Sequence, residues 1–217
     1  MICIAVVNTK GGVGKTTLSC VLAVRAARDS PRVAMVDLDP QRSLAGWWGR
    51  RGSPENPSVL YGVETARDAM EALEQTRWDW VFLDGPPAFL TVYQEMISIA
   101  DLVVIPVIPS AHDLFATQDA VVLAKEEGVD FVCVFNNVGT GEKKLAEAAR
   151  SLLVKSGIPI AQTVIASRAG HKTSATLGKT ASEISGGQAA AGDIDALWLE
   201  IKALALKAAK RKAASHD

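Results

Sequence analysis

The sequence predicts an α/β fold in which a doubly wound, mostly parallel sheet is flanked by helices. Short, β-branched apolar runs without polar alternation recur along the chain, as in strands that are buried on both faces. Stretches with helical character separate these runs, and this order implies βαβ units. Polar and glycine-rich motifs directly follow several runs, at the strand ends where such sheets bind ligands.

Six apolar runs are expected to form strands, with helices between most of them. The predicted strands are Ile2–Val7, Val33–Val36, Trp80–Leu83, Leu102–Val107, Phe131–Phe135 and Ile158–Ile165. The predicted helices are Thr16–Arg28, Glu64–Gln75, Thr91–Ala100, Leu114–Glu127 and Glu142–Ser156, followed by a C-terminal helix over residues 193–212. Turn-forming residues predict an exposed loop over Arg50–Ser58 and an irregular stretch over Ser167–Thr180.

The composition suits one domain with a sizeable core, since 48% of the 217 residues are hydrophobic and 22% are charged. The net charge of −1 means that any nucleic-acid binding must depend on a local basic patch. Cys3, Cys20 and Cys133 are scattered without a C-x-x-C pair, so we expect no disulfide framework or metal cluster. No apolar run approaches the roughly 20 residues needed to cross a bilayer, which predicts a cytoplasmic protein.

The stretch GVGKTT, residues 12–17, follows a predicted strand and opens a predicted helix, as a phosphate-binding loop does. Glycines let backbone N–H groups face a phosphate, and the helix N-terminus adds partial positive charge. Lys15 is expected to reach the β- and γ-phosphates, and the Thr16 hydroxyl to bind Mg²⁺. The loop has Thr9 where the usual motif has its first glycine. The predicted nucleotide-binding residues here are Gly11, Gly12, Val13, Gly14, Lys15, Thr16 and Thr17.

The longer stretch KGGVGKTT, residues 10–17, resembles the deviant phosphate-binding motif of the ParA/MinD class of P-loop ATPases. The resemblance is strong over the first 140 residues and holds in outline beyond them, so residues 1–217 are expected to form a single P-loop ATPase domain. It implies that Lys10 is the signature lysine, which crosses a dimer interface to the phosphates bound by the other subunit. A triphosphate carries about three to four negative charges. One Mg²⁺ and one lysine together leave part of that charge unneutralised. The alternative is that Lys10 is a solvated loop residue.

Three carboxylates follow predicted strands. In VAMVDLDPQ, residues 33–41, Asp37 and Asp39 point the same way because one residue separates them. The stretch is similar to the family's D-x-D-P-Q segment, which implies that Asp39 orients or activates the attacking water and that Asp37 supports Mg²⁺ through its waters. Alternatively, Asp39 only caps the following turn. In WVFLDGPP, residues 80–87, Asp84 is placed to accept from Mg²⁺-bound water or from Thr16, unless the motif is only a strand-ending turn.

Two further segments are assigned through the resemblance. VFNNV, residues 134–138, ends the fifth predicted strand with two asparagines, and the family often has an asparagine here that hydrogen-bonds adenine. We favour Asn136 for this role, because Asn137 could equally be a turn residue. Residues Ile105–Asp113 resemble the family's proline-bearing loop and are expected near the dimer interface.

Within the family, the chain is most similar to the small ParA-type partition and positioning ATPases. That resemblance implies an ATP-bound homodimer that binds DNA non-specifically, associates with the nucleoid and positions a plasmid, chromosome or protein-cluster cargo. It also implies weak ATP hydrolysis that a ParB-like or adaptor protein stimulates. Binding through phosphates should weaken steeply with salt. The candidate DNA-binding residues are Arg168, Lys172, Lys210 and Arg211, with Lys143 and Lys144 as further candidates.

Two alternatives stay open at this point. A MinD-like protein would end in a membrane-binding helix, and Leu197, Ile201, Leu204 and Ala208 do recur at helical spacing. Basic residues surround that helix instead of forming one polar face, so we expect its apolar stripe to pack onto the sheet. A metabolic P-loop ligase is the other alternative, but it would need a dedicated substrate pocket, and no group of residues indicates one.

Overall fold

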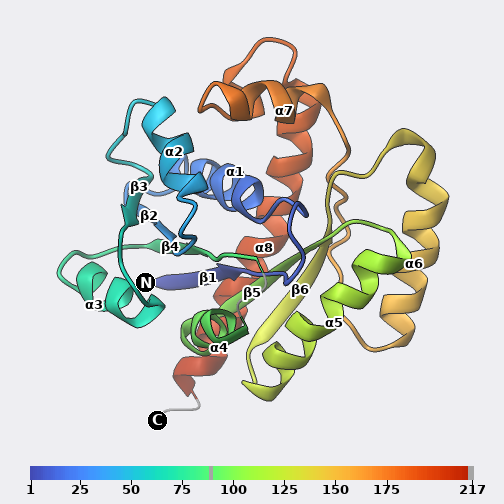
Figure 1. Ribbon diagram of the computed structural model, residues 1–217, viewed down its shortest axis with the longest axis horizontal. Helices are drawn as coiled ribbons and strands as arrows, with labels where there is room; N and C mark the ends of the chain where they lie inside the picture. Colours follow the sequence, from blue (N-terminus) through green and yellow to red (C-terminus); the bar gives the residue numbers. More distant parts are fainter. Residues whose placement is uncertain (88–89, 215–217) are drawn as a thin grey trace.

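The computed structural model describes residues 1–87 and 90–214, without the side chains of residues 111 and 112. Its centre is a six-stranded sheet in the order β3-β2-β4-β1-β5-β6, and each neighbouring pair of strands is parallel (Figure 1). The predicted doubly wound α/β fold is therefore confirmed. The strands are β1 Ile2–Val6, β2 Val33–Asp37, β3 Ser58–Tyr61, β4 Trp80–Asp84, β5 Leu102–Val107 and β6 Asp130–Phe135.

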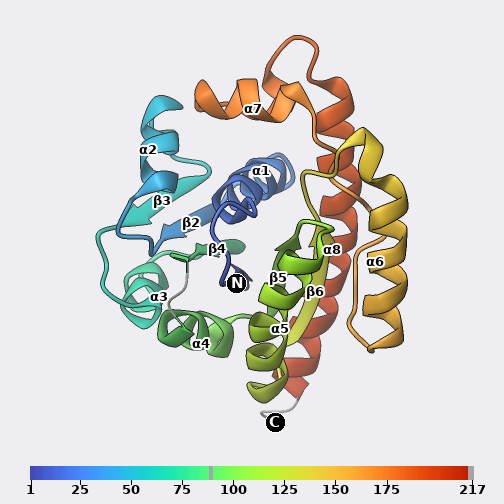
Figure 2. The same cartoon turned by 45° about the vertical axis from the view of Figure 1, so that its right-hand side comes forward.

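Helices cover both faces of the sheet (Figures 1 and 2). On one face lie α1, α2 and α8, whose apolar side chains form one core cluster with the strand residues that point toward them. On the other face lie α3, α4, α5 and α6, which form the second cluster. The helices are α1 Lys15–Ala27, α2 Ser43–Arg50, α3 Ala66–Glu74, α4 Leu90–Ile99, α5 Ala111–Glu126, α6 Lys143–Lys155, α7 Ala169–Thr176 and α8 Gln188–Ala214.

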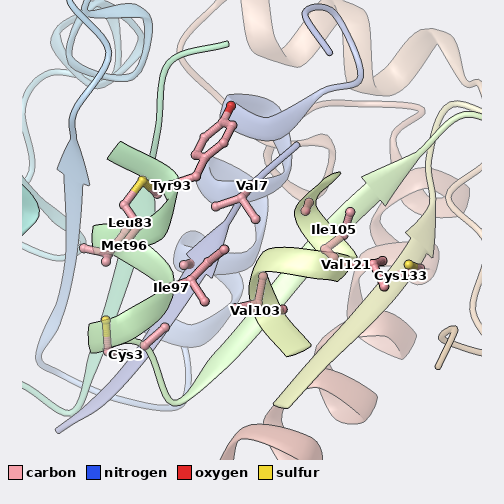
Figure 3. Packing of buried hydrophobic residues seen from close by; sticks show 14 of the residues in the cluster. Cys3, Val7, Leu83, Tyr93, Met96, Ile97, Val103, Ile105, Val121 and Cys133 are labelled. Carbon is pink, nitrogen blue, oxygen red and sulfur yellow. The ribbon is translucent and has the colours of Figure 1, made fainter. Parts of the chain in front are cut away.

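Strand β1 shows how the pleat divides the core. Cys3, Ala5 and Val7 point into the cluster under α4 and α5, whereas Ile4 and Val6 point into the cluster under α1 and α8. Figure 3 shows the first cluster, in which Tyr93, Met96 and Ile97 of α4 pack beside residues of the sheet. All three cysteines are free and buried.

The predicted strand Ile158–Ile165 is wrong. The segment runs alongside the end of β6, where it makes one isolated bridge at Ile160, and a second bridge lies just beyond it at Ala166. Pro159 has no N–H to donate to a ladder, and the carboxylate of Glu200 in α8 accepts hydrogen bonds from the backbone N–H groups of residues 162 and 163. The segment does run along the edge of the sheet, with Ala161 and Ile165 buried and hydrogen-bonded to β6, but these two features prevent a continuous strand.

Two other regions contain more regular structure than predicted. The stretch Ser167–Thr180, predicted to be irregular, includes α7. The exposed loop Arg50–Ser58 lies between α2 and β3, and the sequence predicted neither of these two elements. Strand β3 is short and pairs with β2 alone, so its pattern was too brief to stand out beside the turn residues before it. Helix α2 contains two glycines, which weaken the helical signal.

The C-terminal helix extends beyond the predicted residues 193–212 at both ends, as α8. Its buried stripe packs on the sheet as expected, with Leu197 and Ile201 fully buried, but Leu204 is 39% exposed and Ala205 takes its place. At the far end, the Lys212 amine donates to the last carbonyls of α4, at Ile99 and Ala100. Among the described residues, no helix combines the length and apolar character needed to span a bilayer.

Candidate active site

The glycine-rich loop lies between β1 and α1, at the carboxyl edge of the sheet. Gly12 and Gly14 have φ of 78° and 92°, which favours glycine at both positions. A Cβ on Gly14 would lie 2.3 Å from Nδ2 of Asn136, which donates to the Val13 carbonyl at 2.8 Å. The side chain of Val13 is buried, so it anchors the loop while Gly11, Gly12 and Thr17 stay exposed.

The two lysines of the loop have different environments. Lys15 is 7% exposed, and its Nζ donates to the Lys10 carbonyl at 3.2 Å, across the space that a phosphate would fill. Burial lowers the pKa of Lys15, and the charges of Asp84 and Asp39 oppose that effect. The Lys10 side chain is 40% exposed, and its Nζ lies 2.5 Å from Oδ1 of Asp113 in the first turn of α5.

Asn8, which the sequence did not single out, and Thr9 hold the start of this loop against β5 and α5. Asn8 is fully buried, and its amide donates to the Pro106 carbonyl at 2.9 Å while Oδ1 accepts from the Lys10 N–H at 2.9 Å. Thr9 donates to the Ala116 carbonyl at 3.0 Å. The position of Thr9, which breaks the usual glycine pattern, therefore has a structural role. The contacts of Asn8 with Pro106 and of Thr9 with Ala116 join residues about 100 positions apart, so no local pattern could have revealed them.

Asp37 and Asp84 are aligned in the β2–β4 register, and Asp39 follows on the loop toward α2. Oδ1 of Asp37 accepts from the Asp39 N–H at 3.1 Å and Oδ2 from the Ala45 N–H at 2.8 Å, so this buried carboxylate holds the loop in place. Asp39 lines the cavity in front of the phosphate-binding loop, and its Oδ1 also accepts from the Gln41 N–H at 2.9 Å. Asp39 thus makes the turn cap that was the alternative to catalysis, in a position that also faces the phosphate site.

The buried carboxyl of Asp84 lacks a partner for one oxygen. Oδ1 accepts from the Ser19 hydroxyl at 3.2 Å, whereas Oδ2 is shielded from solvent and accepts no hydrogen bond. Burial raises the pKa of Asp84 to about 7, even though the Thr16 and Ser19 hydroxyls favour its ionised form. An orphaned acidic oxygen beside a threonine hydroxyl fits Mg²⁺ held by Thr16, phosphate oxygens and water. The described residues contain no cluster of three acidic, histidine or cysteine side chains placed to hold a metal ion.

We expect binding of a Mg²⁺-nucleotide to strengthen with pH up to about 7 and to release a proton. The raised pKa means that free Asp84 is largely protonated below that pH, whereas a nearby cation favours the carboxylate. The bound state then holds fewer protons, and affinity should rise by up to about tenfold per pH unit before levelling off. Calorimetry in two buffers of different protonation enthalpy measures the release. Asp84→Asn should remove this pH dependence of the affinity and the associated proton release. If the variant keeps the pH profile and the proton release of the wild type, Asp84 is not the group that titrates.

Two cavities open from the loop, on either side of the first turn of α1. One, of about 440 Å³, extends past Asp39 and Ser43 toward Trp47 and Lys179. The other, of about 400 Å³, has apolar walls that include Leu18, Val21, Ile165 and Ile194, and its polar groups include Asn136. The second cavity has the size and lining of a small-molecule site and could hold the base of a nucleotide whose phosphates lie on the loop. Asn137 also borders it and has a φ of 56°, the left-handed conformation of a turn residue.

The four candidate DNA-binding residues lie at two separate ends of the fold. Lys172 borders the second cavity, and Arg168 precedes α7 and pairs with Asp193 at 2.8 Å. Lys210 and Arg211 lie near the end of α8, where Arg211 contacts Asp130 at 2.5 Å, at the opposite edge of the sheet. The structure therefore does not bring these four residues together.

The parallel sheet, the glycine-rich loop with its buried lysine and the acidic strand ends define a P-loop nucleotide-binding protein. Residues 4–189 match the family described as the CobQ/CobB/MinD/ParA nucleotide binding domain. The chain belongs to this family.

Individual relatives agree with that assignment. The maintenance of carboxysome distribution protein A of Halothiobacillus neapolitanus is 27% identical over 207 residues, covering 91% of this chain and 95% of its own. The protein of the same description from Gloeobacter kilaueensis is 33% identical over 178 residues, or 81% of each chain. Among solved structures, the cell division ATPase MinD of Pyrococcus furiosus has a TM-score of 0.70 at 21% identity, covers 94% of this chain and 99% of its own, and supports the fold alone.

Proposed function

We propose that this protein is a ParA-type ATPase that acts as a nucleotide-dependent dimer switch in partition or positioning. The placement of Lys10 carries the proposal. Its amine is paired with Asp113 of α5, and its side chain is 40% exposed beside Gly11 and Gly12, two exposed residues of the loop. A second copy facing these exposed residues would offer its phosphates to the exchanged lysine. ATP would then bridge the two subunits, and hydrolysis would release them.

In the proposed reaction, each side chain has a role that its environment suits. Lys15 and the backbone of Gly12–Thr17 would bind the phosphates, and Thr16 with Asp84 would hold Mg²⁺, which would supply positive charge to the transferred phosphoryl group. Asp39 orients the attacking water, while Asp37 fixes the loop that carries Asp39. No arginine-finger motif accompanies these groups in the sequence, so hydrolysis by the isolated protein should be slow. A ParB-like or adaptor protein would accelerate it.

The cargo follows only in outline from the relatives. Two of them are described as distributing carboxysomes, and the MinD neighbour is described as a cell division ATPase. We infer that this chain positions a cellular body or a DNA molecule through the nucleoid, in the manner of the small ParA-type proteins.

Non-specific DNA binding by the ATP form is tested by a filter-binding assay across a salt series. We expect affinity to fall steeply with salt, because each neutralised phosphate adds about 0.9 to the slope of log affinity against log salt. Among the described residues neither Lys172 nor Lys210 is in an ion pair, so each pair of candidates includes one lysine without a carboxylate partner. Paired alanine variants, Arg168 with Lys172 and Lys210 with Arg211, should identify which end contacts DNA. Salt-insensitive or absent binding by the wild type would remove DNA from the proposal.

A further inference from the structure

A cavity outside the nucleotide site lies between α6, the end of β6 and residues 164–168. Its volume is about 470 Å³, within the range of small-molecule sites. The segment 164–168 separates it from the candidate base pocket, since Ile165 lines that pocket, Val164 lines this cavity and Ala166 borders both. In Figure 1, α6 lies at the outer edge of the sheet beside β6, well away from α1 and α2. We call this space the α6 cavity.

Residues 158–165, which lie at the edge of the sheet without forming a continuous strand, create the α6 cavity. Ala161 and Ile165 both donate backbone hydrogen bonds to β6, but the residues between them leave the sheet and are held by Glu200. Arg150 of α6 contacts this bulge: its guanidinium donates to the Ala161 carbonyl at 2.7 Å and to the Gln162 carbonyl at 3.2 Å. These hydrogen bonds join the bulge to α6 beside the cavity.

The lining combines an apolar floor with positive charge. Phe135, Val138, Ala146 and Val164 supply the apolar surface. The Arg150 guanidinium lies 5.6 Å from the Phe135 ring centroid and bonds only to carbonyls, so no carboxylate within ion-pair distance neutralises it among the described residues. A planar cation over an aromatic face, at the mouth of an apolar space, favours an anionic group above an apolar body.

The rim strengthens that preference. Lys143 borders the cavity and is in no ion pair within the described part of the chain, whereas Arg168 is already paired with Asp193. Glu147 is the one carboxylate of the lining. Arg150 and Lys143 together therefore leave the rim net positive, although the whole chain carries a net charge of −1.

We propose that the α6 cavity is a binding site for a small amphipathic anion. Such a ligand has a flat or branched apolar body that contacts Phe135 and Val164, and one carboxylate, sulfonate or phosphate that Arg150 and Lys143 bind. Because the segment 164–168 is also a wall of the candidate base pocket, an occupied α6 cavity would contact the nucleotide site through one layer of chain. The site does not depend on DNA binding, dimerisation or ATP hydrolysis.

The test uses 8-anilinonaphthalene-1-sulfonate, an aromatic sulfonate whose fluorescence rises in apolar surroundings. We expect saturable binding of one molecule per chain to the native protein. Lys143→Glu should weaken the affinity at least about fivefold, because it reverses a charge at the rim. Glutamate in the first turn of α6 suits the helix dipole, so this variant should fold normally. Arg150→Met, checked for folding by circular dichroism, should weaken binding further.

Two matched variants are the controls. Lys144→Glu makes the same charge change on the neighbouring residue, which does not line the cavity, and should leave affinity within about twofold. Lys172→Glu makes the same charge change at the base pocket, and it should also have little effect on the affinity for the probe. Equal weakening by Lys143→Glu and Lys144→Glu would show general charge attraction, and weakening by Lys172→Glu alone would place the probe in the base pocket. Either result, or no saturable binding, overturns the proposal.

Discussion

Lys10→Ala is expected to abolish ATP-dependent dimerisation while the monomer still binds nucleotide. The Lys10 side chain is paired with Asp113 of α5, whereas its backbone carbonyl accepts a hydrogen bond from the Lys15 amine of the phosphate-binding loop. In a twofold dimer, the substitution removes two charge-assisted contacts to phosphate at once. At about 1.5 to 3 kcal/mol each, their loss weakens the dimer by roughly 10² to 10⁴-fold. Sedimentation velocity with a non-hydrolysable ATP analogue measures this.

Asp113→Asn is the matched control for Lys10→Ala, because both remove the same ion pair with Lys10. Asp113→Asn keeps the lysine and leaves it free to cross the interface, so this variant should dimerise at least as well as the wild type. If the ion pair matters only for the fold, both variants would lose dimerisation together. That outcome, or normal dimerisation of Lys10→Ala, contradicts the proposed role of Lys10.

Asp39→Asn should lower partner-stimulated ATP hydrolysis by about 10² to 10⁴-fold and leave ATP binding intact. An asparagine side-chain oxygen can still accept the hydrogen bond from the Gln41 N–H, so the turn is preserved while the negative charge is lost. The ATP dimer should therefore form and persist. Phosphate release and dimer lifetime are the two measurements.

Asp39→Ala separates the two roles of this residue. If Asp39 orients water, the alanine and asparagine variants should be similarly inactive. If it serves only as a turn cap, Asp39→Asn would hydrolyse ATP normally and only Asp39→Ala would be impaired. The two variants thus decide between the alternatives that the sequence left open.

Much of this site could be predicted because its chemistry is local in the sequence. The glycine-rich loop, Asp37, Asp39 and Asp84 each follow an apolar run directly, and a parallel sheet brings such strand ends to one edge. The partners of Lys10 could not be predicted in the same way. Asn8 and Asp113 owe their positions to the pairing of β1 with β5 and to the start of α5, and these contacts exist only in the folded chain.

The errors in the fold have a related cause. Ile158–Ile165 has the composition of a strand, but whether it joins the sheet depends on Glu200, about 37 residues further along the chain. Leu204 fits the helical spacing of the apolar stripe, yet the side of α8 that faces the sheet includes Ala205 and leaves Leu204 39% exposed. Periodicity identifies a helix and its apolar positions, whereas the exact contact face depends on how the helix docks.

The most direct test of the dimer switch is the mass of the wild-type protein in solution, by light scattering, with ADP and with a non-hydrolysable ATP analogue. We predict the 23.0 kDa of one chain with ADP and twice that value with the analogue. A mass of one chain in both states, at nucleotide concentrations that calorimetry shows to be saturating, would contradict a switch in which two copies share the bound nucleotide.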